Sequence, residues 1–198
     1  MTRRVPVAPA DLDYAVGLAH DAIAGATSAD WSARAGSLTW TCRETAEHLV
    51  DDLLYYASAL AVRARTRLKL WIKLEESASS DEIAQAIAAA GAVLGAVVDA
   101  APPEARVLVF DDVEIDPEGY LALGAAETLL HTHDVTAGFG TPFVPRVDVC
   151  ERVLARLFPD VELAGDDPWI VLRWATGRAD LPGRPPVGDW KYHGARIG

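Results

Sequence analysis

The chain has 198 residues, of which 51% are hydrophobic and 24% are charged, with 18 basic side chains against 29 acidic ones. This composition excludes a disordered or collagen-like chain, and the length allows one substantial hydrophobic core. The net charge of −11 argues against a nucleic-acid partner, because neutralising a phosphate backbone needs clustered lysine and arginine.

Signals for export are weak. The N-terminal stretch contains Asp11, Asp13 and Asp21 in place of an uninterrupted apolar run, so it does not resemble a secretory signal peptide. Cys42 and Cys150 lie far apart and form no CxxC motif, which favours two reduced thiols. We therefore expect a cytoplasmic protein.

Residues 83–98 carry no charge and are the obvious membrane candidate. Sixteen residues would span about 24 Å as a helix, less than the roughly 30 Å of a bilayer core, so we expect a core helix and no membrane partner. Gly91 and Gly95 lie one turn apart, and their missing side chains would let a neighbouring helix approach closely.

Apolar residues recur at three- and four-residue steps, which predicts helices. The expected helices cover residues 9–26, 41 into the basic stretch 63–69, 81–100, 117–137, 147–158 and 168–175. Thr41 and Glu44 form an S/T-x-x-E capping box for the second helix, and Ser80 is the expected cap of the third. Residues 106–116 are expected to be extended or a loop.

These elements predict an all-α fold, because four long helices are followed by shorter ones and no convincing series of alternating strands is present. The expected organisation is a four-helix bundle over residues 1–140 with a short helical C-terminal extension over residues 141–198 packed on it.

Glu127 and His131 lie four residues apart on the fourth helix, so both side chains could reach one metal ion. A third ligand must come from elsewhere, and His48 on the second helix is the candidate because it adjoins an apolar face. By itself, such a pair on a helix is more often solvated than bound to metal.

Two segments resemble the DinB-like superfamily, and most closely the metal-binding domain of the mycothiol-dependent maleylpyruvate isomerases of actinobacteria. They are WTCRETAEHLVDDLL at residues 40–54 and AETLLHTHD at residues 126–134. The resemblance covers roughly residues 8–140. It implies a DinB-like four-helix bundle in which His48, Glu127 and His131 hold a divalent metal ion.

The chemistry implied by the resemblance is a thiol reaction. Three protein ligands leave a coordination position open, and a thiol that takes it is deprotonated by the ion. The expected partners are mycothiol and a small electrophilic substrate, for a transferase or isomerase, with a homodimer possible. Zinc is the first choice of metal, with nickel, iron and manganese as alternatives. A hydrolase that activates water and a non-catalytic metal-binding or interaction module remain the competing hypotheses.

Asp52 lies four residues after His48 and Asp134 three after His131, so each could orient an imidazole, or equally be a solvated surface acid. His133 should point away from this face and is expected at the surface.

The expectations for the remaining histidines, the arginines and the C-terminal tail are open. His20 and His193 are expected to be exposed or structural. No arginine is assigned to substrate, and the catalytic and substrate-binding residues stay unknown. The tail residues Trp190, Tyr192 and His193 could fold over the opening of the site.

Overall fold

The computed structural model describes residues 4–110 and 113–194, and most of this part of the chain is helical. Four long helices form the packed core, as predicted. A small hairpin follows the third long helix, and two shorter helices follow the fourth. The elements are α1 Pro9–Ala24, α2 Cys42–Val62, α3 Ser80–Ala100, β1 Val107–Phe110, β2 Val113–Ile115, α4 Pro117–Gly138, α5 Val147–Leu157 and α6 Pro168–Ala175.

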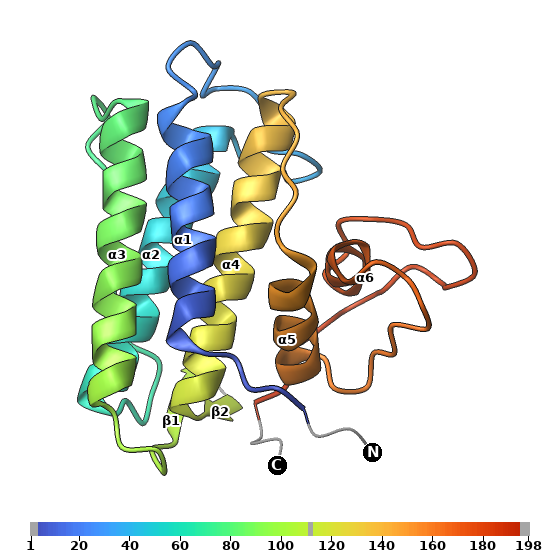
Figure 1. Ribbon diagram of the computed structural model, residues 1–198. Coiled ribbons are helices and arrows are strands. Elements are labelled where there is room, and N and C mark those ends of the chain that lie inside the picture. Colours follow the sequence, from blue (N-terminus) through green and yellow to red (C-terminus); the bar gives the residue numbers. More distant parts are fainter. Residues whose placement is uncertain (1–3, 111–112, 195–198) are drawn as a thin grey trace.

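The four long helices lie side by side in a bundle (Figure 1). Helices α1 and α2 each contact both α3 and α4, while α5 packs on α4 and α6 packs on α5. Because neighbours cover α4 from several directions, almost every residue of that helix is buried. Polar side chains on α4 are therefore held inside the molecule, where they need partners.

The caps that begin the helices agree with the sequence pattern to within one residue. Thr41 Oγ1 accepts a hydrogen bond from the Glu44 amide at 3.1 Å, and the Glu44 carboxylate accepts one from the Thr41 amide at 2.8 Å, which confirms the capping box. The cap of α3 is Ser79, paired with Glu82, and not the predicted Ser80. Ser80 is instead the first residue of the helix.

The prediction that the second helix continues into residues 63–69 was wrong. Helix α2 ends at Val62, and Arg63 adopts a left-handed conformation with φ of 50°. The chain then turns back in an extended strap, residues 66–74, fastened to α2 by side chains of that helix. Asp51 accepts a hydrogen bond from the Ile72 amide at 2.7 Å, and Glu47 accepts one from the Leu74 amide at 3.1 Å.

Helix α3 is long and apolar enough to cross a membrane, by length and composition alone. It has 21 residues, whereas the sequence argument counted only the sixteen uncharged residues 83–98. That argument therefore underestimated the length of the helix. The helix lies in the bundle, where it packs on α1 and α2. A Cβ atom added at Gly91 would lie 2.5 Å from Val16 Cγ2, which confirms the predicted close approach there, whereas Gly95 has nothing within 4 Å.

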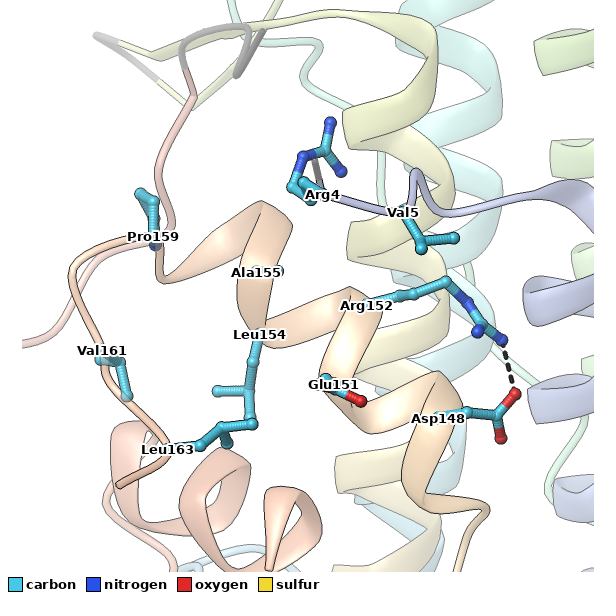
Figure 2. A pocket seen from close by; sticks show the side chains of 10 residues that line it. All are labelled: Arg4, Val5, Asp148, Glu151, Arg152, Leu154, Ala155, Pro159, Val161 and Leu163. Atoms are coloured by element: carbon cyan, nitrogen blue, oxygen red, sulfur yellow. Dashed lines mark hydrogen bonds and ion pairs between the residues drawn. The ribbon is translucent and has the colours of Figure 1, made fainter. Parts of the chain in front are cut away.

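The segment 106–116, expected to be extended or a loop, contains the antiparallel hairpin β1–β2. Beyond α4, the chain forms α5 and α6 along one side of the bundle (Figure 1). A hollow of about 590 Å³ lies between the N-terminal segment, α5 and the loop that follows it (Figure 2). Its cations are already paired, since Arg152 contacts Asp148 at 2.9 Å and Arg4 contacts Glu118.

Candidate metal centre

One face of α2 carries three polar side chains at successive four-residue steps: His48, Asp52 and Tyr56. This spacing places them one above another on the side of the helix that faces α4. The Nε2 atom of His48 lies 3.2 Å from Asp52 Oδ2.

The facing side of α4 carries Glu127, His131 and Asp134. His131 Nε2 lies 3.2 Å from Glu127 Oε2, and His131 Nδ1 lies 3.4 Å from Asp134 Oδ2. Each nitrogen of this imidazole therefore faces a different carboxylate. The other oxygen of Glu127 accepts a hydrogen bond from the Tyr56 hydroxyl at 3.3 Å.

The two helices bring both sets together. The rings of His48 and His131 lie 5.2 Å apart, centroid to centroid. Within the described residues, one potential ligand atom each from His48, Asp52 and His131 all lie within 4.8 Å of one another. A tetrahedral zinc site with bonds of about 2.1 Å separates neighbouring ligand atoms by roughly 3.4 Å, so contacts of 3.2 Å suit ligands of one ion.

The structure places His48 beside His131 and Glu127 in contact with His131, but the group of potential ligand atoms consists of His48, Asp52 and His131 and does not include the predicted Glu127. The sequence predicted for Asp52 at most the role of orienting His48. In the structure the Asp52 carboxylate is itself one of the potential ligands. Which carboxylates would bind the ion stays a prediction.

The protonation tendencies of the imidazoles differ. Burial lowers the pKa of His48, and the nearby His131 lowers it further, so this ring favours the neutral form that binds metal. Burial would also lower the pKa of His131, but the carboxylates of Asp134 and Glu127 outweigh it and raise that pKa to about 9.

The carboxyl groups respond to the same surroundings. Burial, reinforced by the charge of Glu127, raises the pKa of Asp52 well above its ordinary value. Burial acts on Glu127 in the same direction, but the hydrogen bond and charge of His131 outweigh it and lower the pKa of that group.

The donor set fits a divalent cation. Asp52, Glu127 and Asp134 supply three carboxylates: each lies within 3.4 Å of an imidazole nitrogen of His48 or His131, and Asp134 also pairs with Arg178 at 3.0 Å. The pKa of His131 and that of Asp52 are both raised, so without an ion it is bound protons that balance the charge of this cluster. A bound ion of charge +2 would replace these protons, and imidazole and carboxylate are ligands that zinc and related metals accept.

A comparison with family models identifies the family of this helical bundle. The model of the Mycothiol maleylpyruvate isomerase N-terminal domain matches residues 16–136. The chain belongs to this family. No curated protein and no solved structure matches the chain. The resemblance to the DinB-like superfamily is thereby confirmed, and the family includes an isomerase, although the match does not establish a specific activity for this chain.

The family domain opens to solvent beside His48. A hollow of about 170 Å³ is lined there by Trp40, Glu44, Glu47, His48, Trp71 and Lys73. The Trp40 ring lies 4.7 Å from the His48 ring and 6.5 Å from that of His131. Trp71 and Lys73 come from the strap, just beyond the segment 63–69 that was wrongly predicted as helix, and they form one wall of this entrance.

Other candidate histidines lie apart from the potential ligands. His133 is half-buried, and its ring packs edge to face on Trp169 of α6, so the expected surface position was wrong. The reason is that α6 covers this side of α4. His20 is exposed beside Asp21, and the backbone amide of His193 donates a hydrogen bond to the Leu157 carbonyl oxygen at 2.8 Å.

The two cysteines are free and buried. Burial raises the pKa of Cys42, and it raises the pKa of Cys150 to about 12, so neither thiol has the character of an activated nucleophile.

Sequence reasoning missed Tyr56, although its place eight residues after His48 on the same helical face was a usable signal.

Tyr192 belongs to the tail that was expected to fold over the opening, and its ring is buried against Phe158 and Trp190. Burial and the neighbouring Glu127 raise the pKa of Tyr192 well above its ordinary value, so its hydroxyl stays protonated. The hollow beside His48 is lined by no described residue of the tail, so this part of the tail does not form a wall of that opening.

Proposed function

We propose that this protein is a divalent-metal-dependent enzyme that joins a small thiol to an electrophilic substrate, as a transferase or isomerase, with mycothiol as the thiol. The observation that carries the proposal is the gathering of potential ligand atoms from His48, Asp52 and His131 within 4.8 Å of one another. In this set His131 is buried and His48 and Asp52 are partly exposed, and such a set next to an opening suits a site at which a ligand reaches the ion.

The residues that would hold the metal are His48 and His131, with carboxylate oxygen from Asp52, Glu127 or both. Zinc is the first choice for these nitrogen and oxygen ligands, with nickel, iron and manganese as alternatives. When bound, the ion would lower the pKa of a thiol that reaches it and so supply a thiolate nucleophile at neutral pH.

The surrounding side chains prepare the site for this ion. Asp134 Oδ2 lies 3.4 Å from Nδ1 of His131, where it favours the tautomer with the proton on Nδ1 and leaves the Nε2 lone pair for ligation. Tyr56 donates a hydrogen bond to Glu127 and limits the rotation of that carboxylate.

The entrance limits what can reach the centre. Its volume of about 170 Å³ is smaller than the roughly 300 to 1,000 Å³ of pockets for drug-sized ligands, so it would admit the thiol end of a molecule and a small electrophile. Trp40 and Trp71 are 40% and 62% exposed and offer aromatic surface that a bound ligand would cover, and Lys73 is a cation at the rim.

The test uses protein loaded with Co²⁺, whose near-ultraviolet spectrum acquires a sulfur-to-metal charge-transfer band when a thiolate binds. Titration with mycothiol and with N-acetylcysteine should produce this band, whereas N-acetylserine should not. A transferase should then consume thiol when an electrophile is added, whereas an isomerase should convert maleylpyruvate to its trans isomer with the thiol regenerated and not consumed. Stoichiometric Co²⁺ without any charge-transfer band would reject the thiol chemistry, and turnover of an ester without thiol would favour the hydrolase.

A further inference from the structure

The part of the chain beyond the family match returns to the candidate metal centre. The match ends at residue 136, but Arg178, which follows α6, reaches α4. Its Nε atom lies 3.0 Å from Asp134 Oδ2 and 3.2 Å from Oδ1. The side chains of Arg178 and Asp134 are 9% and 2% exposed, so this ion pair is buried and little screened by solvent.

The Arg178–Asp134 ion pair lies next to His131, a potential metal ligand. Asp134 Oδ2, which Arg178 holds, lies 3.4 Å from Nδ1 of His131. A carboxylate held in this position fixes both the ring orientation and the tautomer of a metal-binding histidine. Arg178 therefore acts on His131 through Asp134 and has no need to touch the ion.

Arg178 is itself held in place by the local fold. Its amide donates a hydrogen bond to the Arg173 carbonyl oxygen at 2.7 Å, and its Nη1 atom donates one to the Thr176 carbonyl oxygen at 3.3 Å. Gly177 has φ of +70°, a conformation that lets the chain turn after α6 and direct Arg178 back to α4. The guanidinium is therefore positioned before any metal binds.

We infer that Arg178 is a positioning residue of the metal centre, so that the C-terminal extension completes a site whose potential ligands all lie in the family domain. This inference rests on the proposed metal-dependent function. It goes beyond it by assigning a role to a residue outside the segment that the family model matches.

A neighbouring arginine supplies a matched control. Arg173 is also half-buried and lies on the same side of α4, but its Nη1 atom lies 3.5 Å from His133, and its guanidinium stacks over Trp169 at 5.3 Å. Replacing Arg173 disturbs the packing of the extension without touching Asp134. A general effect of loosening the extension would therefore appear in both variants.

The test compares full-length Arg178→Gln, Arg178→Lys and Arg173→Gln with the unmodified protein. Zn²⁺ affinity is measured by competition with a chromogenic chelator, and the ligand-field spectrum is recorded with Co²⁺. Arg178→Gln should weaken Zn²⁺ binding by about 10- to 100-fold and change the Co²⁺ spectrum. Arg178→Lys should recover part of the affinity, and Arg173→Gln should bind as the unmodified protein does.

Folding is checked by circular dichroism of the metal-free proteins. If Arg178→Gln does not fold, Arg178→Lys decides, because it keeps the charge but loses the planar group that contacts both oxygens of Asp134. Equal Zn²⁺ affinity in the Arg178 variants and the Arg173 control would overturn the inference and leave the proposed function intact. Absence of Zn²⁺ binding by the unmodified protein would reject the proposed function itself.

Discussion

Arg156 has no exposed side-chain surface and yet carries a full positive charge. Its Nη2 atom donates a hydrogen bond to Asp116 at 2.8 Å, and its Nη1 atom donates one to the His193 carbonyl oxygen at 3.1 Å. Asp116 also caps α4 by accepting a hydrogen bond from the Gly119 amide at 2.9 Å. One carboxylate thus serves a helix terminus and a buried cation together.

Asp116→Asn separates these two tasks. Asparagine caps helices about as well as aspartate, so the variant loses mainly the negative charge beside Arg156. Arg156 keeps a second, more distant carboxylate, since its Nε atom lies 3.9 Å from Glu118 Oε2, so losing the closer counter-charge should lower the free energy of unfolding at pH 7 by about 2 kcal/mol. Urea denaturation of both proteins measures this difference, and a change below about 0.5 kcal/mol would contradict it.

The same pair predicts a pH dependence. Burial alone would raise the pKa of Asp116, but the hydrogen bonds from Arg156 and the Gly119 amide outweigh burial and hold it below its ordinary value. Because the folded-state pKa is depressed, the contribution of this carboxylate is fully present above the unfolded value of about 4 and is lost as the pH falls through the folded-state pKa.

The stability difference between the unmodified protein and Asp116→Asn should therefore be constant from about pH 5 to 7 and shrink below about pH 4. Urea denaturation at several pH values measures it. A difference that grows as the pH falls would show that Asp116 is not the group responsible.

At the scale of the elements, α1 and α3 approach closely because Gly91 faces Val16, whereas Gly95 on the same helix faces open space. Both glycines have negative φ, so an alanine adds only a methyl group. Gly91→Ala should lower the free energy of unfolding by about 1 to 3 kcal/mol through overpacking. Gly95→Ala should raise it by up to about 1 kcal/mol through helix propensity.

Thermal and urea denaturation of these two variants provide the comparison, and each controls for the other. Equal changes in both would mean that the helices do not meet at Gly91 as the structure describes.

Local patterns predicted the elements well where local chemistry decides them. The capping box at Thr41, the apolar repeat of the long helices and the prolines after α3 all act within a few residues. The end of α2 was missed because the Arg63–Lys69 stretch contains good helix formers, and the strap that replaces it is held by Asp51 and Glu47 through contacts that no local pattern reveals.

For the site, the spacing of Glu127 and His131 within one helix was readable from the sequence, whereas their meeting with His48 depended on the family resemblance. The part of Asp52 as a potential ligand and the link from Arg178 to Asp134 could not be predicted, because both depend on how α2 and the extension pack on α4.

At the scale of the whole molecule, a bound ion would join α2 to α4, since its potential ligands come from both helices. Zn²⁺ at about 100 times its dissociation constant should therefore stabilise the folded state by about 2.7 kcal/mol. For a chain of this size the melting temperature should rise by roughly 5 to 10 °C. Differential scanning calorimetry with and without Zn²⁺ measures the shift, and His48→Ala should show little of it.

The most direct test of the metal centre is elemental analysis of the purified protein after incubation with Zn²⁺ and exhaustive dialysis. We predict about one ion per chain in the unmodified protein and far less in His48→Ala and His131→Ala, with Cys150→Ala as a control that keeps its metal. Full retention in both histidine variants, or an unmodified protein that binds no ion, would contradict the account.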